Sequence, residues 1–388
     1  MLGDDVRHRG GRSDRAAVHR AGGDRHRRPR HGDERAVGGM AAAYRQRLSQ
    51  AVETSGRRQM IWITFLISAA ILVFAAIKLA EYGDAIAFHT RLGGMFIGAL
   101  LIASATSLPE LLTMINSINQ GHINLTAGDL FGSSMFNMML LGVLDMLFYK
   151  NRILRRVALK HALTASLGTM MTGMAVFFLL ANINIKLGWL GLDSLLMMAT
   201  YFVGIWLLRS NPVGGTEEDA AGEEVGKMPP LRKAVIGFAV TAVVLVLVAP
   251  YMVSSGSGIA EITGLGDGFV GMVLIAFVTS LPELVAMIAA ARFGAYDMAV
   301  GNLFGSNIFN MFALAFADVI YTQGSFLGAI DPVFALAGLL AMLLTTLGLI
   351  GNLAQVERRV WIVELDALLL IVVYLVGLYL LYLRGIGG

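Results

Sequence analysis

Long apolar segments alternate with short polar ones from residue 61 to residue 384. A helix that crosses ~30 Å of hydrocarbon needs ~20 mainly apolar residues, and ten segments reach this length. They are residues 61–82, 94–118, 124–148, 158–182, 187–209, 232–254, 267–291, 297–321, 328–351 and 361–384. The pattern therefore predicts an all-α polytopic membrane protein with ten transmembrane helices.

The ten segments fall into two groups of five. Between them lies the only long polar interior stretch, residues 210–231, which contains Glu217, Glu218 and Asp219. We interpret this stretch as a linker on the cytoplasmic side. The first five-helix half is then residues 60–209, and the second is residues 232–388.

The first 59 residues have a different composition. Ten of the first forty residues are Arg, and the stretch has no apolar segment that could form a core or a secretory signal. We predict a basic, disordered N-terminal extension. One interpretation is an arm that touches anionic lipid or nucleic acid. The interpretation that we favour is a mis-assigned start, with translation beginning at Met40 or Met60.

The composition supports a bilayer as the solvent. The chain is 56% hydrophobic and 15% charged, whereas soluble domains are about 25% charged. We expect a multi-pass protein of the cell's inner (plasma) membrane. Cysteine is absent, which excludes disulfides, thiolate metal sites and Cys nucleophiles.

The loop charges indicate an orientation. Lys and Arg cluster after the third, seventh and ninth segments and around the linker, and such residues favour the cytoplasmic face. Five spans in each half then make the two halves antiparallel.

The two halves share an internal sequence repeat. Residues 102–138 align without a gap to residues 275–311, at an offset of 173, and 19 of 37 positions are identical. The shared residues include Thr-Ser-Leu-Pro-Glu and Phe-Asn, which a common apolar composition does not explain. The repeat extends over two segments in each half, 94–148 and 267–321. Inverted repeats of this kind place a substrate site near the midplane, where interrupted helices meet.

Each copy has a proline inside an apolar segment. Pro109 and Pro282 have no N–H, so the carbonyls of Ala105 and Val278 lose their partner and the helix is expected to kink. In lipid, a free carbonyl needs protein, water or an ion to satisfy it.

A glutamate follows each proline. Glu110 and Glu283 have no Lys or Arg within their own repeat helix, and an intramembrane carboxylate usually marks an ion route. Two such groups brought together by pseudo-symmetry repel unless a proton or a cation intervenes. One divalent ion would cancel both charges.

Further oxygens surround each glutamate in the sequence. They come from Thr106, Ser107, Ser133, Asn137, Thr279, Ser280, Ser306 and Asn310. Ser133 and Asn137 are four residues apart, so they share one helix face. Hard oxygen ligands favour Ca²⁺, Mg²⁺ or Na⁺ over Zn²⁺ or Cu.

These motifs resemble the cation/Ca²⁺ exchanger superfamily, and most closely its bacterial Na⁺/Ca²⁺ exchanger-like branch. The resemblance rests on Thr106–Glu110, Gly132–Asn137, Thr279–Glu283 and Gly305–Asn310, and it extends over about residues 60–384. It implies a transporter rather than an enzyme, with no cofactor.

The resemblance also implies ligands for the transported ions. Glu110 and Glu283 would bind the divalent ion, with further oxygen from Thr106 and Thr279. The implied sodium ligands are Ser107, Ser133, Ser280, Ser306 and the carbonyls of Ala103 and Ala276. Asn137 and Asn310 would line the centre, and the first and sixth spans would slide as a pair to alternate access.

The sequence departs from the family pattern in three respects. Many members carry an acid where Asn310 stands, which leaves this site one charge short. The first copy has Asp129 and Ser134 where the second has Asn302 and Asn307; Asp129 either donates an extra carboxylate or serves helix packing. Neither copy has the Glu that the proton-coupled branch carries shortly after this position, which favours sodium.

The leading hypothesis is Ca²⁺ export driven by Na⁺. The same-class alternative is an antiporter coupled to H⁺ or K⁺, or one that carries another divalent ion. From other classes, we considered an intramembrane aspartyl protease, prompted by Asp129, and a non-transporting sensor or scaffold. The expected partners are Ca²⁺, Na⁺ (or H⁺ or K⁺) and the lipid bilayer, without nucleic acid or an obligate protein partner.

Overall fold

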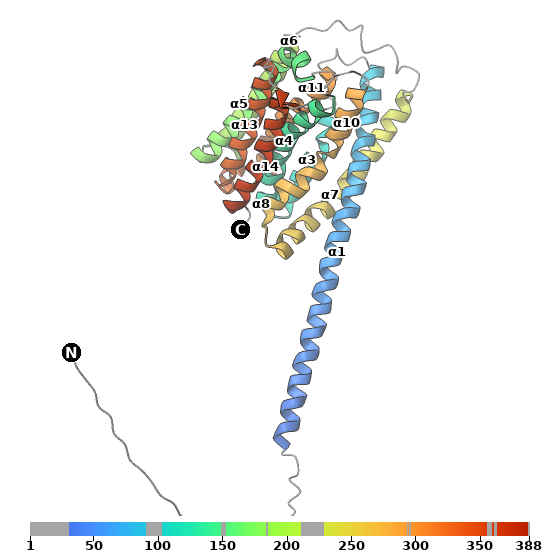
Figure 1. Cartoon of the computed structure of the whole chain (residues 1–388), viewed down its shortest axis with the longest axis vertical. Coiled ribbons are helices and arrows are strands. Elements are labelled where there is room, and N and C mark those ends of the chain that lie inside the picture. The colour runs from blue at the N-terminus through green and yellow to red at the C-terminus, as the bar shows by residue number, and fades with distance from the viewer. Residues whose placement is uncertain are drawn as a thin grey trace, which may run out of the picture. The chain divides into compact units, whose positions relative to one another are not determined.

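The computed structural model describes residues 31–90, 103–148, 153–183, 185–210, 229–292, 294, 296–354, 359–360 and 363–386. The chain divides into two compact units, residues 1–56 and residues 57–388. In the first unit, residues 31–56 are helical. The second unit contains the helical bundle shown in Figure 1.

Nearly all described elements are helices. In chain order they are α1 (His31–Thr90), α3 (Leu108–Asn119), α4 (Ile123–Leu147), α5 (Ile153–Ala181), α6 (Leu192–Ser210), α7 (Leu231–Thr263), α8 (Asp267–Val270), the π-helix η1 (Gly271–Ile275), α9 (Ala276–Thr279), α10 (Leu281–Arg292), α11 (Tyr296–Ile320), α12 (Phe326–Ala329), α13 (Phe334–Ala354) and α14 (Leu365–Leu383). Two short antiparallel hairpins, β1 (Lys186–Leu187) with β2 (Leu190–Gly191) and β3 (Arg359–Val360) with β4 (Val363–Glu364), precede α6 and α14.

Disorder was predicted before residue 60, whereas α1 begins at His31 and includes residues 31–59. Residues 40–55 contain no Gly or Pro, and most of them are Ala, Arg, Gln, Met, Leu or Glu, which have high helix propensity. This local preference explains why the segment is helical without an apolar span. Residues 1–30 lie outside the described residues.

Seven helical segments among the described residues are long and apolar enough to cross a membrane. They are Ser55–Gly83, Ile123–Leu147, His161–Ala181, Leu231–Thr263, Asp267–Arg292, Tyr296–Ile320 and Leu365–Leu383. Two shorter apolar helices lie at Leu192–Leu208 and Phe334–Ile350. The predicted segment 94–118 falls partly outside the described residues, which resume at residue 103.

Three predicted segments begin too early. The segment predicted from residue 361 starts as a helix only at Leu365, after the β3–β4 hairpin. The segment predicted from residue 187 starts as a helix only at Leu192, because the β1–β2 hairpin occupies residues 186–191. The segment predicted from residue 328 is interrupted after α12, and α13 begins at Phe334. Here Pro332 cannot donate a helical N–H, and Asp331 Oδ1 accepts a hydrogen bond from the Val333 N–H instead.

The outer faces of several helices are apolar. Leu66 and Phe74 on α1, and Val240 and Leu247 on α7, are each more than half exposed. Contiguous apolar surface of this kind is rare on soluble monomers. A bilayer removes the cost of exposing it, so the described bundle is that of a membrane protein.

The element bounds recur at the offset of the sequence repeat. Adding 173 to the bounds of α3, α4, β1, β2 and α6 gives those of α10, α11, β3, β4 and α14. The correspondence therefore extends well beyond the two 37-residue stretches that align in sequence. The third helix differs, because α5 is continuous whereas its counterpart is divided into α12 and α13.

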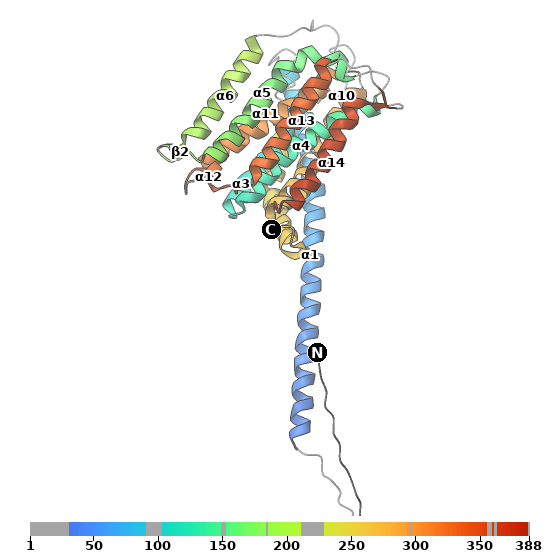
Figure 2. The same ribbon diagram turned by 60° about the vertical axis from the view of Figure 1, so that its left-hand side comes forward.

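The buried apolar side chains form two clusters. The larger joins α4, α5, α11 and α13, which lie side by side in Figures 1 and 2. The second joins α1 and α7 with η1, α9 and α3. This second cluster therefore packs the α1–α7 pair against the interrupted helices.

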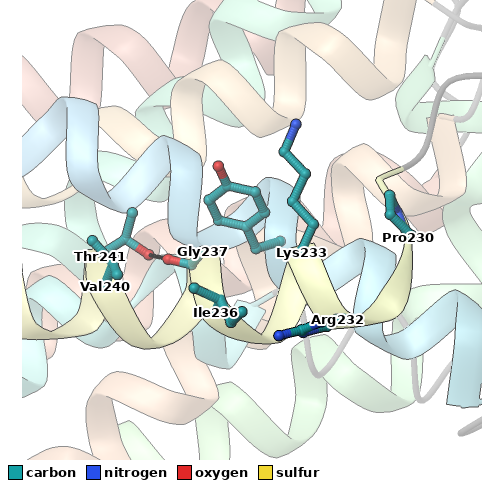
Figure 3. A pocket seen from close by; sticks show the side chains of 8 residues that line it. Pro230, Arg232, Lys233, Ile236, Gly237, Val240 and Thr241 are labelled. Carbon is teal, nitrogen blue, oxygen red and sulfur yellow. Dashed lines mark hydrogen bonds between the residues drawn. The ribbon is translucent and has the colours of Figure 1, made fainter.

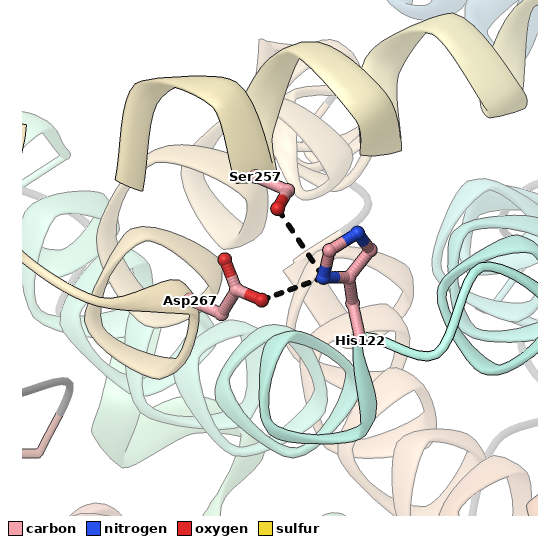
Figure 4. A network of polar contacts seen from close by, with 3 residues as sticks. All are labelled: His122, Ser257 and Asp267. Atoms are coloured by element: carbon pink, nitrogen blue, oxygen red, sulfur yellow. Dashed lines mark hydrogen bonds and ion pairs between the residues drawn. The ribbon is translucent and has the colours of Figure 1, made fainter. Parts of the chain in front are cut away.

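A polar network connects α7 with α4 and α8 (Figure 4). His122 Nδ1 lies 2.6 Å from Asp267 Oδ2 and 3.2 Å from Ser257 Oγ. Nearby, Gln120 Nε2 donates to the carbonyl of Pro250 on α7 at 3.3 Å. These contacts fix one end of α7 against the bundle. His122 thus has an acidic partner in Asp267.

Candidate ion-binding site

Both proline-containing helices are interrupted one residue before the Leu-Pro pair. Ser107 has φ −86° and ψ 10°, and Ser280 has φ −88° and ψ 4°. This backbone region is sparsely populated and often holds residues of functional sites. The π-helix η1 precedes the second interruption, another feature frequent at such sites. The predicted break in both helices is confirmed.

The interruptions place a glutamate in the first turn of a new helix. Glu110 lies in the first turn of α3 and Glu283 in the first turn of α10. The N-terminal end of a helix carries a partial positive charge that favours a carboxylate. Both side chains are buried, with exposed fractions of 1% and 0%.

The two halves exchange hydrogen bonds at these glutamates. Ser107 Oγ donates to Glu283 Oε1 at 2.9 Å, and Ser280 Oγ donates to Glu110 Oε1 at 3.4 Å. Each glutamate is thus bound by the serine that precedes the other one. Ser306 Oγ also donates to Glu283 Oε1, at 3.4 Å. Glu110 and Glu283 therefore belong to one buried cluster.

The two threonines show the same reciprocal arrangement. Thr106 Oγ1 donates to Asn302 Oδ1 at 3.3 Å, and Thr279 Oγ1 donates to Asp129 Oδ1 at 3.0 Å. Ser133 Oγ lies 3.4 Å from Thr279 Oγ1. The threonine hydroxyls also lie 3.1 Å and 3.4 Å from the carbonyl oxygens of Ala103 and Ala276, respectively.

Amide side chains from α4 and α11 complete the cluster. Asn137 Nδ2 donates to Asn307 Oδ1 at 3.0 Å, and Asn310 Nδ2 donates to Ser134 Oγ at 3.5 Å. Asn307 Nδ2 donates to the Ser134 carbonyl at 3.2 Å. These contacts connect the middles of the two long buried helices.

Glycines bring α4 close to the interrupted helix. A Cβ added to Gly128 would lie 2.2 Å from the Gly268 carbonyl oxygen, and one added to Gly132 would lie 2.5 Å from the Met272 carbonyl oxygen. Small residues permit this backbone approach in membrane helices. The orientation of α4, and with it the direction of Asp129 and Ser133, is fixed by this packing.

Several acceptor oxygens in the cluster have no hydrogen-bond partner among the described residues. They are Glu110 Oε2, Glu283 Oε2, Asp129 Oδ2, Asn137 Oδ1 and Asn310 Oδ1. A buried unsatisfied acceptor costs ~1–3 kcal/mol, and a charged one costs more. Within the described part of the chain, no Lys or Arg forms an ion pair with either glutamate. The cluster therefore offers negative charge and free oxygens to a cation.

The cluster is not a compact three-carboxylate metal centre. Among the described residues, no group of three or more His, Asp or Glu side chains has the geometry to hold a metal ion. Any bound cation would be shared between glutamate, hydroxyl, amide and carbonyl oxygens.

The structure brings together all twelve residues that the sequence proposed as ligands. Each is buried: Ala103, Thr106, Ser107, Glu110, Ser133, Asn137, Ala276, Thr279, Ser280, Glu283, Ser306 and Asn310. Sequence reasoning omitted four cluster members from this set, namely Asp129, Ser134, Asn302 and Asn307. The spacing contained a signal for two of them, because Asp129 precedes Ser133 by four residues and Asn302 precedes Ser306 by four.

A separate cavity of about 480 Å³ lies between α1 and the start of α7 (Figure 3). Its lining includes Tyr82, Ile236 and Val240, with Arg232 and Lys233 as its charged residues. None of its described lining residues is a carboxylate.

Known proteins resemble the chain over most of its length. A protein of Alkalimonas amylolytica that bears the name of an antiporter, CaxA, is 26% identical over 303 residues, which are 76% of this chain and 92% of the relative. The solved H⁺/Ca²⁺ exchanger CAX has a similar fold, with a TM-score of 0.64 and 15% identity over 84% of this chain and 85% of CAX. The sodium-calcium exchanger NCX_Mj superposes with a TM-score of 0.52 and 21% identity, over 83% of this chain and 99% of NCX_Mj.

The family model described as "Sodium/calcium exchanger protein" matches residues 60–209 and 233–383. These ranges contain both interrupted helices, the two glutamates and the elements that recur at an offset of 173. The chain therefore belongs to the sodium/calcium exchanger family within the cation/Ca²⁺ exchanger superfamily, whose members are membrane antiporters rather than enzymes.

Proposed function

We propose that the protein is a secondary active antiporter that exchanges Ca²⁺ for Na⁺ across the cell's inner (plasma) membrane. Its ten transmembrane helices form two inverted five-helix repeats, residues 60–209 and 232–388, joined by the cytoplasmic linker 210–231. Transport occurs by alternating access at the site around Glu110 and Glu283. The observation that carries the proposal is the reciprocal pairing of these glutamates with Ser280 and Ser107, which leaves one oxygen of each carboxylate unpaired.

Ca²⁺ is the ion that best suits the two glutamates. Their charges cancel those of one divalent cation, and the hydroxyls of Thr106 and Thr279 add neutral oxygens from opposite halves. Ca²⁺ accepts 6–8 oxygen ligands in flexible geometry, which a cluster of mixed hydroxyls, amides and carboxylates can provide. Neutralising the two buried glutamates also removes their mutual repulsion.

Na⁺ would share the carboxylates of Glu110 and Glu283 with Ca²⁺ and would use further oxygens of its own. The candidates are the hydroxyls of Ser107, Ser133, Ser280 and Ser306, the carbonyls of Ala103 and Ala276, and the central amides of Asn137 and Asn310. Both ions depend on Glu110 and Glu283, so their binding is mutually exclusive and exchange follows. The absence of a further Glu after Gly128-Asp129 and after Gly301-Asn302 favours Na⁺ over H⁺. The alternative is an H⁺- or K⁺-coupled antiporter of Ca²⁺ or another divalent cation.

The α1–α7 pair is the candidate moving part. The pair meets the interrupted helices through a buried apolar cluster that is separate from the larger core of the bundle. Among its polar contacts with the rest of the bundle are those of His122 with Ser257 and of Gln120 with the Pro250 carbonyl. Sliding this pair past the interrupted helices would expose the site to either side in turn, as expected for repeat-based transporters.

The direct test is ⁴⁵Ca²⁺ uptake into proteoliposomes, with Na⁺, K⁺ and H⁺ gradients imposed one at a time. We expect uptake to follow an outward Na⁺ gradient. Uptake that ignores Na⁺ and follows the pH gradient would reject Na⁺ coupling and leave Ca²⁺ transport intact. No uptake under any gradient would reject the antiport itself.

Replacing Ser107 by alanine should weaken Ca²⁺ transport. The change removes the 2.9 Å donor to Glu283 and leaves that carboxylate less well oriented. A hydrogen bond to a charged group contributes ~1.5–3 kcal/mol, so we expect the half-saturating Ca²⁺ concentration to rise about tenfold or more.

Ser68→Ala is the matched control for this change. Ser68 is also a buried serine of a membrane helix, but its hydroxyl contacts the Phe65 carbonyl of α1 and the Met252 sulfur of α7 rather than a glutamate. We expect its half-saturating Ca²⁺ concentration to stay at the wild-type value. Equal effects of the two substitutions would show that Ser107 acts only through the stability of the bundle.

A further inference from the structure

The two pseudo-symmetric halves of the site differ in charge at one pair of equivalent positions. Asp129 and Asn302 are 173 residues apart, both are buried, and each accepts a hydrogen bond from the threonine of the opposite half. The two contacts, at 3.0 Å and 3.3 Å, are nearly equal in length. The geometry is therefore shared, but only the Asp129 position carries a carboxylate.

Asp129 cannot be explained as a residue that faces lipid or water. Its side chain is 0% exposed, and its Oδ2 has no hydrogen-bond partner among the described residues. The glycines on either side, Gly128 and Gly132, hold α4 against η1 and the residues before it, so the carboxylate cannot rotate outward. Its partner is Thr279 rather than a second aspartate, which gives no support to a protease.

Other oxygens surround this carboxylate. Thr279 Oγ1 lies 3.0 Å from Asp129 Oδ1, 3.4 Å from Ser133 Oγ and 3.4 Å from the Ala276 carbonyl oxygen. One carboxylate with neutral hydroxyl and carbonyl oxygens carries a single negative charge. That charge matches a monovalent metal cation, and a buried carboxylate needs either such a cation or a proton to compensate it.

We propose that Asp129 holds one monovalent metal cation, together with the oxygens of Thr279 and Ser133, and that this position exists in one half of the site only. The inference rests on the proposed antiport and deepens it. Thr279 is shared with the proposed Ca²⁺ ligands, so Ca²⁺ binding withdraws its hydroxyl from the Asp129 position and releases the monovalent ion. Asp129 thereby adds one monovalent cation to each exchange of one Ca²⁺.

The inference makes the exchange electrogenic. Two monovalent ions neutralise Glu110 and Glu283, as one Ca²⁺ does, and the ion at Asp129 is an additional positive charge moved per cycle. Wild-type Ca²⁺ uptake into Na⁺-loaded vesicles should therefore be faster when the vesicle interior is held positive. In D129N the additional ion is lost, and uptake should not respond to the membrane potential.

The test measures ⁴⁵Ca²⁺ accumulation in proteoliposomes whose potential is set by K⁺ and valinomycin. At zero potential and a tenfold Na⁺ gradient, the loss of one coupled ion should lower the final Ca²⁺ accumulation ratio about tenfold in D129N. The double variant D129N/N302D moves the charge to the equivalent position of the other half. We expect it to recover both the voltage response and the accumulation ratio, which a purely structural role for Asp129 would not restore.

The possible results distinguish failure of the Asp129 inference from failure of the proposed antiport. D129N uptake with the wild-type voltage response and accumulation ratio would overturn the role of Asp129, while Ca²⁺ transport would stand. Wild-type vesicles without Ca²⁺ uptake would overturn the antiport. If D129N does not fold, N302D alone decides the matter: an accumulation ratio about tenfold higher than wild type supports the inference, and an unchanged ratio overturns it.

Discussion

Replacing either Glu110 or Glu283 by glutamine is expected to reduce Ca²⁺ flux by about 100-fold or more. Each change keeps the shape of the side chain but removes half of the charge that compensates Ca²⁺. Removing one partner of a buried charged interaction costs ~2–5 kcal/mol. Initial rates of ⁴⁵Ca²⁺ uptake into proteoliposomes measure the effect.

The folded state of these variants should be preserved. Glutamine removes the repulsion between two buried carboxylates, so E110Q and E283Q should unfold at or above the wild-type temperature in Ca²⁺-free buffer. Added Ca²⁺ should stabilise the wild type, because it binds only the native state, and should not stabilise the variants. E261Q, at an exposed glutamate of α7, should keep wild-type flux. Flux retained in E110Q or E283Q would contradict the role of the glutamates.

Replacing Gly128 by alanine is expected to prevent correct assembly of the bundle. The added Cβ would lie 2.2 Å from the Gly268 carbonyl oxygen and 2.9 Å from the Met272 nitrogen. Backbone atoms cannot move aside as a flexible side chain can, and overpacking of this kind costs ~1–3 kcal/mol or more. The yield of monodisperse protein after detergent extraction, and its thermal unfolding temperature, should both fall.

G168A provides the matched control for this prediction. Gly168 is also buried in a membrane helix, α5, but a Cβ there would meet only Ile308 Cγ1 at an ordinary 3.6 Å. Alanine is favoured over glycine in helices by ~1 kcal/mol, so G168A should be as stable as the wild type or more so. An unimpaired G128A would show that α4 and the interrupted helix are not packed as closely as the structure indicates.

The type of ligand in the site was predictable because it depends on residues that are close together in the sequence. Pro109 and Pro282 predict interrupted helices, and Glu110 and Glu283 next to them predict an ion route. The duplication then predicts that the two sets meet. The particular pairing, in which Ser107 binds Glu283 and Ser280 binds Glu110, depends on how the halves pack, which residue spacing alone does not determine.

Asp129 shows where local rules were too weak. Because its neighbour is Gly128, helix packing explained the position of Asp129 as well as an ion-binding role did, and only the tertiary contact with Thr279 shows that its side chain belongs to the cluster. The structure supports both: the glycine packs against the interrupted helix, and the aspartate points into the cluster.

Helix boundaries were least predictable where local backbone preferences, rather than hydropathy, determine the structure. The β1–β2 hairpin includes the apolar residues Leu187 and Leu190, so its residues were assigned to the following helix. The division between α12 and α13 depends on Pro332 and on Asp331 bonding to a nearby N–H. In α1, helix propensity rather than apolarity sets the structure of residues 40–55.

The central claim is that one glutamate from each half contributes to a single Ca²⁺ site. Equilibrium ⁴⁵Ca²⁺ binding to the purified protein in Na⁺-free buffer tests it most directly. We expect one high-affinity Ca²⁺ per chain in the wild type, displaced by Na⁺, and none in either E110Q or E283Q. Binding of two Ca²⁺ by the wild type, with one retained in each single variant, would contradict the claim.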